Sequence, residues 1–518
     1  MAKEDEKVKK PEISQPKSGK LVSEFIEEIS GILKIKNTLF YRTDVKNIVE
    51  VLRIKHNKAS DKYFIGFENI TPNRFITVLE KYVNPGDMYF DRTSNNFYFK
   101  TRSISAYLAK TILESAKLRN ELYPINRIFT VPIPIIYNKC ITFPRKGYDA
   151  RYGSWMNYDA PEINDTMVIE EAKKVLEEIF KEFCFKTSQD KSNAIAGLLT
   201  PFIRGLYSNF NIRTPLFFYE GNRERTGKDY LAGITGIVYE GNALEEPPIC
   251  NGEKGNNNDE LRKKILSAFI AGRKRMHFSN NKGYINNAVF EGIVTSKVFS
   301  DRVLGRNEIL SFNNELEFSL SGNTGITYTA DLGNRCRFIR LFLDIEDANA
   351  RKFERPNLHE WVSENRNKIL SALFCLVKNW FDKSCPKGSL PFASFPEWAE
   401  ICGGIMENAG YESPCKPDIE NMSIGGDTET MDMKTLFETC YEHKPEQWIS
   451  KQEIIGIIYN SGQDMFSYLD FGKRADLTKF GIKISKFTNR ILSGIRMVCD
   501  RPKSQVIVRK YKFTKETL

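Results

Sequence analysis

The sequence contains few histidines, no closely spaced cysteines and no long apolar run. Four histidines occur in 518 residues, and no two of the ten cysteines have the spacing of zinc ligands. A metal cluster and histidine-based catalysis are therefore disfavoured, and the cysteines are expected to be reduced thiols. No stretch approaches the roughly 20 apolar residues of a membrane helix, and residues 1–20 lack the apolar core of a secretory signal. We expect a cytoplasmic protein without membrane contact, whose residues 1–20 form a disordered arm.

The positive charge is concentrated at the C-terminal end of the chain. Residues 471–518 contain thirteen lysines and arginines but only three acidic residues, an excess that equals the net charge of +10 of the whole chain. The remaining residues are thus neutral overall. A neutral body with a basic end is typical of proteins that bind a polyanion such as DNA. The alternative is a charged tail without a partner, although apolar residues alternate through this segment as they do in a folded module.

The length predicts several domains, because a single hydrophobic core stops growing well below 518 residues. Helical and β-rich patches over residues 21–160 indicate an N-terminal α+β domain. Residues 161–400 have the order of elements of an α/β domain, with helices packed on a central sheet. A Pro/Gly/Ser-rich linker is expected at 401–431. Residues 432–518 have the plan of a winged helix, with helices at 433–443, 450–458 and 478–492 and strands at 496–499 and 505–511.

A short apolar strand near the middle of the chain leads into a glycine-containing loop and a helix. Phosphate-binding loops need glycines that let backbone N–H groups turn inward, a helix N-terminus, and a lysine that reaches the β- and γ-phosphates. We expect nucleotide contacts from Gly221, Thr226, Gly227, Lys228, Asp229 and Tyr230. The usual pattern is Gly-x4-Gly-Lys-Ser/Thr, whereas here the glycines are six residues apart and an aspartate follows the lysine. A Gly-Lys turn without a ligand is the alternative.

Later residues match the other parts of a nucleotide motor. Asn323 follows the alternating apolar residues of a predicted strand, where a polar group can sense the γ-phosphate. Arg335 and Arg337 come within fifteen residues of it. Arg366 lies in a helix predicted over residues 360–377. Arginines stabilise the charge on a transferred phosphoryl group, from the same subunit or from a neighbour. Taken singly, each arginine is better explained as a solvated surface charge.

Several motifs occur in an order that resembles one known family. They are Tyr230-Leu231, Ser300-Asp301-Arg302-Val303-Leu304-Gly305, Ser321-Gly322-Asn323-Thr324, Asp331-Leu332-Gly333-Asn334-Arg335, and Trp361 with Arg366. Over about residues 160–518 the chain resembles the MCM-like AAA+ helicase-initiators of mobile genetic elements, the replication proteins of staphylococcal pathogenicity islands and cassette chromosomes. The resemblance implies a P-loop AAA+ core in a homo-hexameric ring that hydrolyses ATP with Mg²⁺ between subunits. It also implies single-stranded DNA in the pore and origin duplex on the C-terminal winged helix.

The resemblance also assigns roles to individual residues. Lys228 would bind phosphate, and Asn323 would be the sensor. Arg335 would be the trans-acting finger and Arg366 the lid arginine. A hairpin over residues 297–306 would project into the pore, where Lys297, Arg302 and Arg306 would grip DNA phosphates.

One position departs from the family pattern. The predicted strand that should end in a magnesium-binding acid has Ser279 where relatives place aspartate. Magnesium prefers hard carboxylate oxygens and keeps several of its waters. We therefore interpret Asp229, one residue after Lys228, as the carboxylate that supplies the metal site. The competing interpretation is a protein that binds ATP and assembles but turns over slowly.

The C-terminal module carries the expected duplex-binding surface. Its basic residues follow the spacing of the predicted third helix and the turn of the following hairpin; they are Lys479, Lys483, Lys486, Arg490, Arg501 and Lys503. The buried side of that helix is expected to consist of Ile482, Ile484, Phe487 and Ile491. The third helix of a winged helix enters the major groove, and this many phosphate contacts make binding salt-dependent. Protein contact is the alternative use of the module.

The leading interpretation is an ATP-dependent replicative DNA helicase that also binds the origin of a mobile genetic element. A second interpretation is a DNA-binding scaffold in which ATP drives assembly with weak or no hydrolysis. A primase or nuclease would need a cluster of metal-binding carboxylates in the N-terminal domain, and the sequence shows none there.

Overall fold

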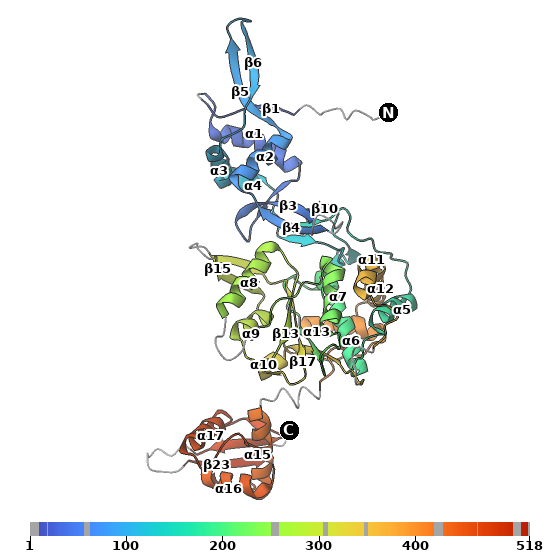
Figure 1. The fold of residues 1–518 in the computed structure, drawn as a ribbon, viewed down its shortest axis with the longest axis vertical. Helices are drawn as coiled ribbons and strands as arrows, with labels where there is room; N and C mark the ends of the chain where they lie inside the picture. Colours follow the sequence, from blue (N-terminus) through green and yellow to red (C-terminus); the bar gives the residue numbers. More distant parts are fainter. Residues whose placement is uncertain are drawn as a thin grey trace. The chain divides into compact units, whose positions relative to one another are not determined.

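The computed structural model shows a mixed α/β protein that divides into two compact units (Figure 1). The structure describes residues 10–17, 19–55, 63–249, 258–303, 309–345, 351–418, 428–463, 465–500 and 509–515. The larger unit consists of Met1–Gly283, Asn287–Ile326 and Arg335–Lys416, and the smaller unit of Tyr284–Asn286, Thr327–Asn334 and Pro417–Leu518. Over the described ranges, no helix has the length and apolar character needed to cross a membrane.

The first part of the larger unit combines four helices with two small sheets. The helices are α1 (Val22–Ile35), α2 (Pro72–Tyr82), α3 (Ala106–Glu114) and α4 (Ala116–Glu121). One sheet contains β2 (Leu39–Arg42), β3 (Asn47–Lys55) and β4 (Tyr63–Asn69), and the other β1 (Glu12–Ser14), β5 (Asn84–Asp91) and β6 (Asn96–Thr101). Helix α1 is amphipathic and buries Phe25, Ile29 and Leu33 completely. This part therefore has a hydrophobic core of its own.

Short strands and two helices connect this part to the central sheet. The strands are β7 (Arg127–Phe129), β8 (Ile135–Tyr137), β9 (Cys140–Thr142), β10 (Gly147–Asp149) and β11 (Ser154–Met156). They are followed by α5 (Ile169–Phe180), α6 (Ser188–Leu199) and the 3₁₀ helix η1 (Phe202–Leu206). Helix α6 begins after Thr187 because the Thr187 hydroxyl accepts a hydrogen bond from the Asp190 N–H at 3.1 Å.

A parallel sheet of four strands forms the centre of the larger unit. The strands are β12 (Leu216–Gly221), β13 (Arg275–Asn281), β17 (Glu317–Asn323) and β19 (Cys336–Leu341), in the order β13–β17–β12–β19. Nearly all of their residues are buried, as expected for parallel strands covered by helices. The longer helices between these strands are α7 (Lys228–Glu240), α8 (Asn258–Ala271) and α9 (Ala288–Thr295). Strand β12 comes first in the sequence but lies between β17 and β19. Open α/β sheets bind ligands at the carboxyl ends of strands where the strand order diverges in this way.

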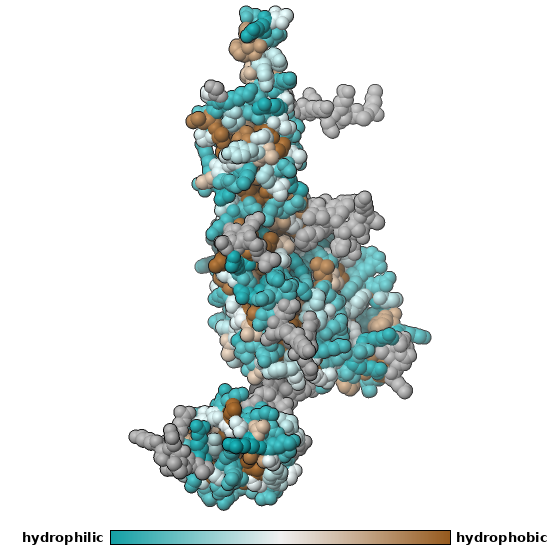
Figure 2. All heavy atoms as spheres, turned by 60° about the vertical axis from the view of Figure 1, so that its left-hand side comes forward, coloured by the Kyte–Doolittle hydropathy of each residue, from teal (hydrophilic) through white to brown (hydrophobic). Residues whose placement is uncertain are grey.

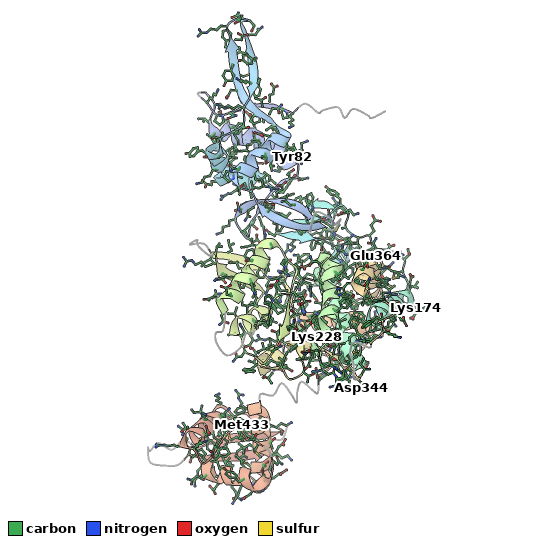
Figure 3. The ribbon with its side chains drawn as sticks, viewed as in Figure 1. Tyr82, Lys174, Lys228, Asp344, Glu364 and Met433 are labelled. Atoms are coloured by element: carbon green, nitrogen blue, oxygen red, sulfur yellow. The ribbon has the colours of Figure 1, made fainter. Side chains whose placement is uncertain are left out.

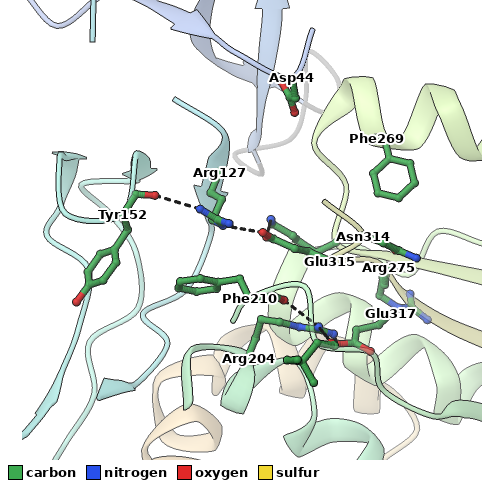
Figure 4. Close-up of polar contacts among 12 residues, drawn as sticks. Asp44, Arg127, Tyr152, Arg204, Phe210, Phe269, Arg275, Asn314, Glu315 and Glu317 are labelled. Carbon is green, nitrogen blue, oxygen red and sulfur yellow. Dashed lines mark hydrogen bonds and ion pairs between the residues drawn. The ribbon is translucent and has the colours of Figure 1, made fainter. Parts of the chain in front are cut away.

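An ionic network lies at the opposite, amino end of β17 (Figure 4). Arg127 of β7 donates to the Glu315 carboxylate at 2.7 Å, and Lys274 pairs with the same carboxylate at 3.2 Å. Arg204 of η1 pairs with Glu317. Because removing one partner of a buried ion pair leaves an uncompensated charge, these contacts hold β7 and η1 to the central sheet.

The remaining elements of the chain up to residue 382 are mostly short. They are β14 (Tyr284–Ile285), β15 (Val298–Arg302), β16 (Ile309–Asn313), β18 (Thr327–Tyr328), α10 (Ala330–Gly333), α11 (Leu358–Glu364) and α12 (Arg366–Asp382). Strands β15 and β16 pair as an antiparallel hairpin whose second strand lies beyond the predicted segment 297–306. The single helix expected over 360–377 is instead two helices that meet at Asn365, where φ is −99° and ψ is 19°.

Helix α13 (Pro396–Asn408) crosses the domain boundary that we expected at residue 400. Its Trp398, Cys402 and Ile405 are fully buried. A Cβ atom at Gly404 would meet the Trp380 indole nitrogen at 2.9 Å, so the glycine permits close packing and not flexibility. The predicted linker, residues 401–431, thus begins inside α13, where the chain up to Asn408 is helical and packed. The nine described cysteines are free thiols, and five of them are buried.

The C-terminal segment of the smaller unit packs three helices against an antiparallel sheet. The helices of this segment are α15 (Thr428–His443), α16 (Lys451–Ser461) and α17 (Arg474–Lys486). Its strands β20 (Ile449–Ser450), β21 (Ile491–Leu492), β22 (Ile495–Cys499) and β23 (Lys510–Lys515) lie in the order β20–β23–β22–β21. Phe437, Ile454 and Phe480, one from each helix, share a buried core with Met497 and Phe513 of the sheet.

Helix α17 ends earlier than predicted. It stops at Lys486 and not near residue 492, because Asn489 has a left-handed backbone with φ of 66°. The next residues form a hairpin whose two turn residues, Ser493 and Gly494, both have positive φ. Turns of this type fit the twist of antiparallel strands.

The early end of α17 also changes which of its residues are buried. Ile482 is 56% exposed and Ile491 is 49% exposed, so the prediction that both lie on the buried side was wrong. Ile484 and Phe487 are buried as predicted, and Phe480 joins them. These three residues are three to four positions apart, which places them on one face of the helix.

Candidate functional site

The loop between β12 and α7 is shaped by two glycines. Gly227 has φ of +89°, a left-handed conformation that is strained for other residues, and it caps the N-terminus of α7. Gly221 ends β12, and a Cβ atom there would collide with the Thr226 hydroxyl. Lys228 is therefore the first residue of a helix whose first-turn N–H groups have no partners within the helix. This is the geometry of an anion site at a helix N-terminus.

The two strands that flank β12 hold this loop in place. The Asn222 N–H donates to the Leu341 carbonyl at 3.1 Å, and the Asn222 side-chain oxygen accepts from the Leu343 N–H at 2.9 Å. On the other side, the Thr324 N–H donates to the Gly221 carbonyl at 2.8 Å. The loop is thus fixed at the carboxyl edge of β17, β12 and β19.

Lys228 and Asp229 begin a polar cluster at this edge. Lys228 is only 7% exposed, and its Nζ atom lies 3.3 Å from Asp229 Oδ2. The other carboxylate oxygen, Oδ1, accepts a hydrogen bond from the Ser321 hydroxyl of β17 and lies 3.5 Å from His277 Nε2 of β13. The fold therefore joins three segments that are far apart in the sequence.

The surroundings of Asp229 keep it ionised. Burial alone raises the pKa of this carboxyl, but the contacts with His277 and Ser321 and the charge of Lys228 outweigh burial and lower the pKa to about 2. Burial lowers the pKa of His277, and its contact with Asp229 opposes that change. At neutral pH we therefore expect a negative Asp229 beside a neutral imidazole.

Two polar atoms near the loop are buried without a hydrogen-bond partner among the described residues. They are the hydroxyl of Thr226, which is 0% exposed, and the side-chain oxygen of Asn323. Asn323 ends β17 and pairs in register with Gly221. An unsatisfied buried polar group costs about 1–3 kcal/mol, so such atoms are typical of a site completed by a ligand.

The strand expected to supply a magnesium ligand does not end in an acid. Ser279 of β13 is 7% exposed, and its hydroxyl lies 3.5 Å from the Glu246 carbonyl. The Glu246 carboxylate is paired with Arg273. Within the ranges that the structure describes, no group of three or more His, Cys, Asp or Glu residues could hold a metal ion. In the cluster described above, the carboxylate next to Lys228 is that of Asp229.

Arg366 is not brought to the loop. Its Nε atom donates to the Val238 carbonyl of α7 at 3.0 Å. Val238 lies ten residues after Lys228, which corresponds to about 15 Å along a helix. Figure 3 labels Glu364, two residues before Arg366, apart from Lys228 in the same part of the larger unit. This geometry places Arg366 away from the loop of its own chain, and its role as the lid arginine stays a prediction.

Arg335 lies at the amino end of the central sheet. It precedes β19, and its Nη1 atom donates to the Glu291 carbonyl at 2.5 Å. Leu341 pairs with Gly221, so six residues of β19, about 20 Å, separate Arg335 from the phosphate loop of the same chain. Arg337 is buried, with its guanidinium 3.6 Å from the centre of the Phe392 ring. Of these two arginines, Arg335 is the more exposed.

Tyr230 directs its side chain away from the loop. Its ring stacks on His359 of α11 at a centroid distance of 3.6 Å, and its hydroxyl accepts from the His359 N–H at 3.0 Å. The side chain of Tyr230 thus links α7 to α11, and its contact with a nucleotide stays a prediction.

The residues expected to bind DNA are partly described. Lys297 and Arg302 are exposed at the β15–β16 hairpin, whereas Arg306 lies outside the described residues. Lys479 and Lys486 are exposed on α17, and Lys483 lies 5.3 Å from the centre of the Tyr468 ring. Arg490 follows the helix and lies 4.8 Å from the centre of the Phe487 ring, so it does not continue a helical stripe. Arg501 and Lys503 lie outside the described residues.

His277 is the site residue that sequence reasoning missed. It lies on β13, is 1% exposed, and its Nδ1 atom is 2.8 Å from the Ser319 hydroxyl. The available signal was a histidine within a short buried strand, where a polar ring needs partners on neighbouring strands. The sequence alone does not show which strands are neighbours.

Comparisons with known proteins identify no family. No family model matches the chain, and no curated protein matches it. The chain is similar to two solved structures, the A-form apo structure of the NrS-1 C-terminal region and the A-form apo structure of its 305–718 segment. The first has a TM-score of 0.36 and 11% identity, and the match covers 85% of this chain and 99% of that chain. The second has a TM-score of 0.33 and 8% identity, with 86% and 100% covered. At these TM-scores the likeness carries no conclusion about function.

Proposed function

We propose that the protein is an AAA+ P-loop ATPase that works as a replicative DNA helicase and initiator of a mobile genetic element. The observation that carries the ATPase proposal is the position of Gly227 and Lys228 between a buried parallel strand and a helix N-terminus. The unsatisfied atoms of Thr226 and Asn323 support it, because Thr226 belongs to this loop and Asn323 pairs in register with Gly221, where the loop begins. A triphosphate fits this arrangement, since its negative charge complements both the lysine and the helix dipole.

The residues of the cluster have distinct roles in this proposal. Lys228 would exchange its contact with Asp229 for the β- and γ-phosphates, and Asn323 would sense the γ-phosphate. Mg²⁺, when bound, neutralises phosphate charge, and it is commonly held by one or two carboxylates together with phosphates and water. Asp229, held ionised by Ser321 and His277, fits that requirement. Arg335 would serve the nucleotide of the next subunit in a homo-hexameric ring.

Replacement of Asp229 by asparagine tests its proposed metal role. We expect ATP hydrolysis to fall about 100-fold, because metal binding supplies several kcal/mol of transition-state stabilisation. The measurement is phosphate release at saturating ATP over a series of Mg²⁺ concentrations. Glu364→Gln, an exposed acid on α11, is the matched control and should hydrolyse ATP normally. Unchanged hydrolysis by Asp229→Asn at every Mg²⁺ concentration would contradict the role.

A second candidate function is ATP-driven assembly on DNA without turnover. The serine at position 279 favours it, because this strand lacks the acid expected of an efficient ATPase. Phosphate release stimulated by single-stranded DNA, together with strand displacement on a forked duplex, would support the helicase. ATP-dependent assembly with neither activity would support the scaffold.

We infer that the smaller unit is a winged-helix module that binds the origin duplex. Its three helices precede the antiparallel strands β22 and β23, and Lys479 and Lys486 are exposed on α17, opposite the buried Phe480 and Ile484. A helix with a basic exposed face, packed against a hydrophobic core, suits insertion into the major groove. Lys297 and Arg302 of the β15–β16 hairpin would contact single-stranded DNA in the pore.

The double variant Lys483→Ala/Lys486→Ala tests the duplex-binding surface. The slope of log affinity against log salt should decrease by about 1 for each lysine that contacts a phosphate. Binding is measured with a covalently closed duplex, which has no single-stranded end to enter a pore. Lys434→Ala, an exposed lysine on α15, is the control. A slope equal to that of the unchanged protein would show that α17 does not contact the DNA backbone.

A further inference from the structure

Strands β5 and β6 form a ribbon that extends beyond helices α1–α4 (Figure 1). Its register pairs Tyr89 with Tyr98 and Phe90 with Phe97. Because successive side chains of a strand point to opposite faces, the tyrosine pair lies on one face and the phenylalanine pair on the other. The ring centres are 6.0 Å apart in the tyrosine pair and 5.0 Å apart in the phenylalanine pair.

The aromatic side chains of the ribbon are unusually exposed. Phe97 is 68% exposed, Tyr98 50% and Phe90 48%. Met88 and Tyr89 of the same ribbon are also exposed. Brown residues are visible near the tip of the ribbon in Figure 2, among hydrophilic neighbours. Single exposed apolar residues are common, but a contiguous group of this kind marks a binding surface.

The exposed charge of the ribbon is positive. Lys17 and Lys100 lie 4.9 and 6.0 Å from the centre of the Tyr89 ring, and Arg92 is exposed in the turn. The two acidic residues are both engaged within the protein. Asp87 is 2% exposed and forms an ion pair with Lys17 at 2.9 Å. Asp91 accepts hydrogen bonds from the Thr93 N–H at 2.9 Å and the Ser94 hydroxyl at 2.7 Å.

We propose that this ribbon is a binding site for single-stranded DNA, with one base stacked on Tyr98, on the face that carries Lys100, and another stacked on Phe97 on the opposite face. Stacking on aromatic rings beside cations is how sequence-independent single-strand binders work. In a duplex the base faces are already stacked on one another, so this surface suits an unpaired strand. The stacking chemistry follows from the exposed aromatic residues, whereas the choice of DNA as the polymer rests on the proposed function.

The double variant Phe97→Ala/Tyr98→Ala tests the site in the full-length protein. Binding of a fluorescein-labelled oligothymidine is followed by anisotropy without nucleotide, and we expect the Kd to rise at least about 10-fold, since each stacked base contributes substantially to affinity. Tyr107→Ala is the control, because Tyr107 of α3 is 82% exposed and lies outside the ribbon. An unchanged Kd would overturn the proposal.

A second measurement separates this site from other DNA contacts of the chain. Oligothymidine containing 4-thiothymidine is crosslinked to the unchanged protein, and crosslinks are expected within residues 84–101. Crosslinks confined to other segments would overturn the proposal. So would a change of sedimentation coefficient caused by Phe97→Ala/Tyr98→Ala without DNA, because it would assign the ribbon to contacts between copies of the chain. If the protein crosslinks at the ribbon but does not hydrolyse ATP, the result supports the single-strand site and contradicts the proposed ATPase.

Discussion

Replacement of Lys228 by alanine is expected to lower ATP hydrolysis at least about 100-fold. The lysine is 7% exposed and stands at the N-terminus of α7, where its charge adds to that of the helix dipole. Its removal takes away the cation proposed to stabilise charge on the γ-phosphate. Steady-state phosphate release at saturating ATP measures the effect, and a fluorescent ATP analogue reports binding separately.

A matched control for Lys228 is available in the same unit. Lys174 of α5 is exposed, so Lys174→Ala removes an equal charge from a solvated position (Figure 3). Lys174→Ala should unfold close to the temperature of the unchanged protein, whereas Lys228→Ala leaves the partly buried Asp229 carboxylate without its cation and should unfold at a lower temperature. Hydrolysis is therefore compared below the melting temperatures of both variants. Equal hydrolysis by Lys228→Ala and Lys174→Ala would remove the basis of the proposed ATPase.

Replacement of Arg335 by alanine is expected to cause a loss of about 1,000-fold or more in hydrolysis. About 20 Å separates this arginine from the phosphate loop of its own chain, measured along β19. It can therefore stabilise a phosphoryl group only if that group is bound by a neighbouring subunit. Phosphate release by the purified variant tests the size of the effect.

A mixture of two inactive variants tests whether Arg335 acts between subunits. In a ring assembled from Lys228→Ala and Arg335→Ala chains, roughly a quarter of the interfaces would combine an intact Lys228 with an intact Arg335. Hydrolysis by the mixture should therefore rise above that of either variant alone. If Arg335 only supports the fold of its own chain, through its hydrogen bond to the Glu291 carbonyl, mixing the variants will not restore ATP hydrolysis.

The phosphate loop could be predicted from the sequence because its requirements are local. Gly227, Lys228 and the strand before them are within a dozen residues, and the structure gives Gly227 the left-handed backbone that only glycine adopts without strain. The strand and helix patterns of the mixed α/β fold are likewise local. The basic character of the C-terminal segment required only counting.

Predictions that depended on where a helix ends or packs were less successful. Asn489 and the Ser493–Gly494 turn end α17 early and expose Ile491. The glycines of α13 suggested a linker, but they pack closely against Trp380 and its surroundings. Linkers and tight helix contacts are both rich in small residues, so composition cannot distinguish one from the other.

The sequence by itself determined the mixed α/β class, the position of the glycine–lysine loop, and the neutral body with its basic end, because each depends on neighbouring residues or on totals. Only the tertiary structure decided that Asp229 meets His277 and Ser321, since these residues come from segments up to 92 positions apart that parallel pairing brings to one sheet edge. It also placed Arg366 and Arg335 away from this chain's own loop. Distances along helix α7 and strand β19 set those positions, and no spacing in the sequence reveals them.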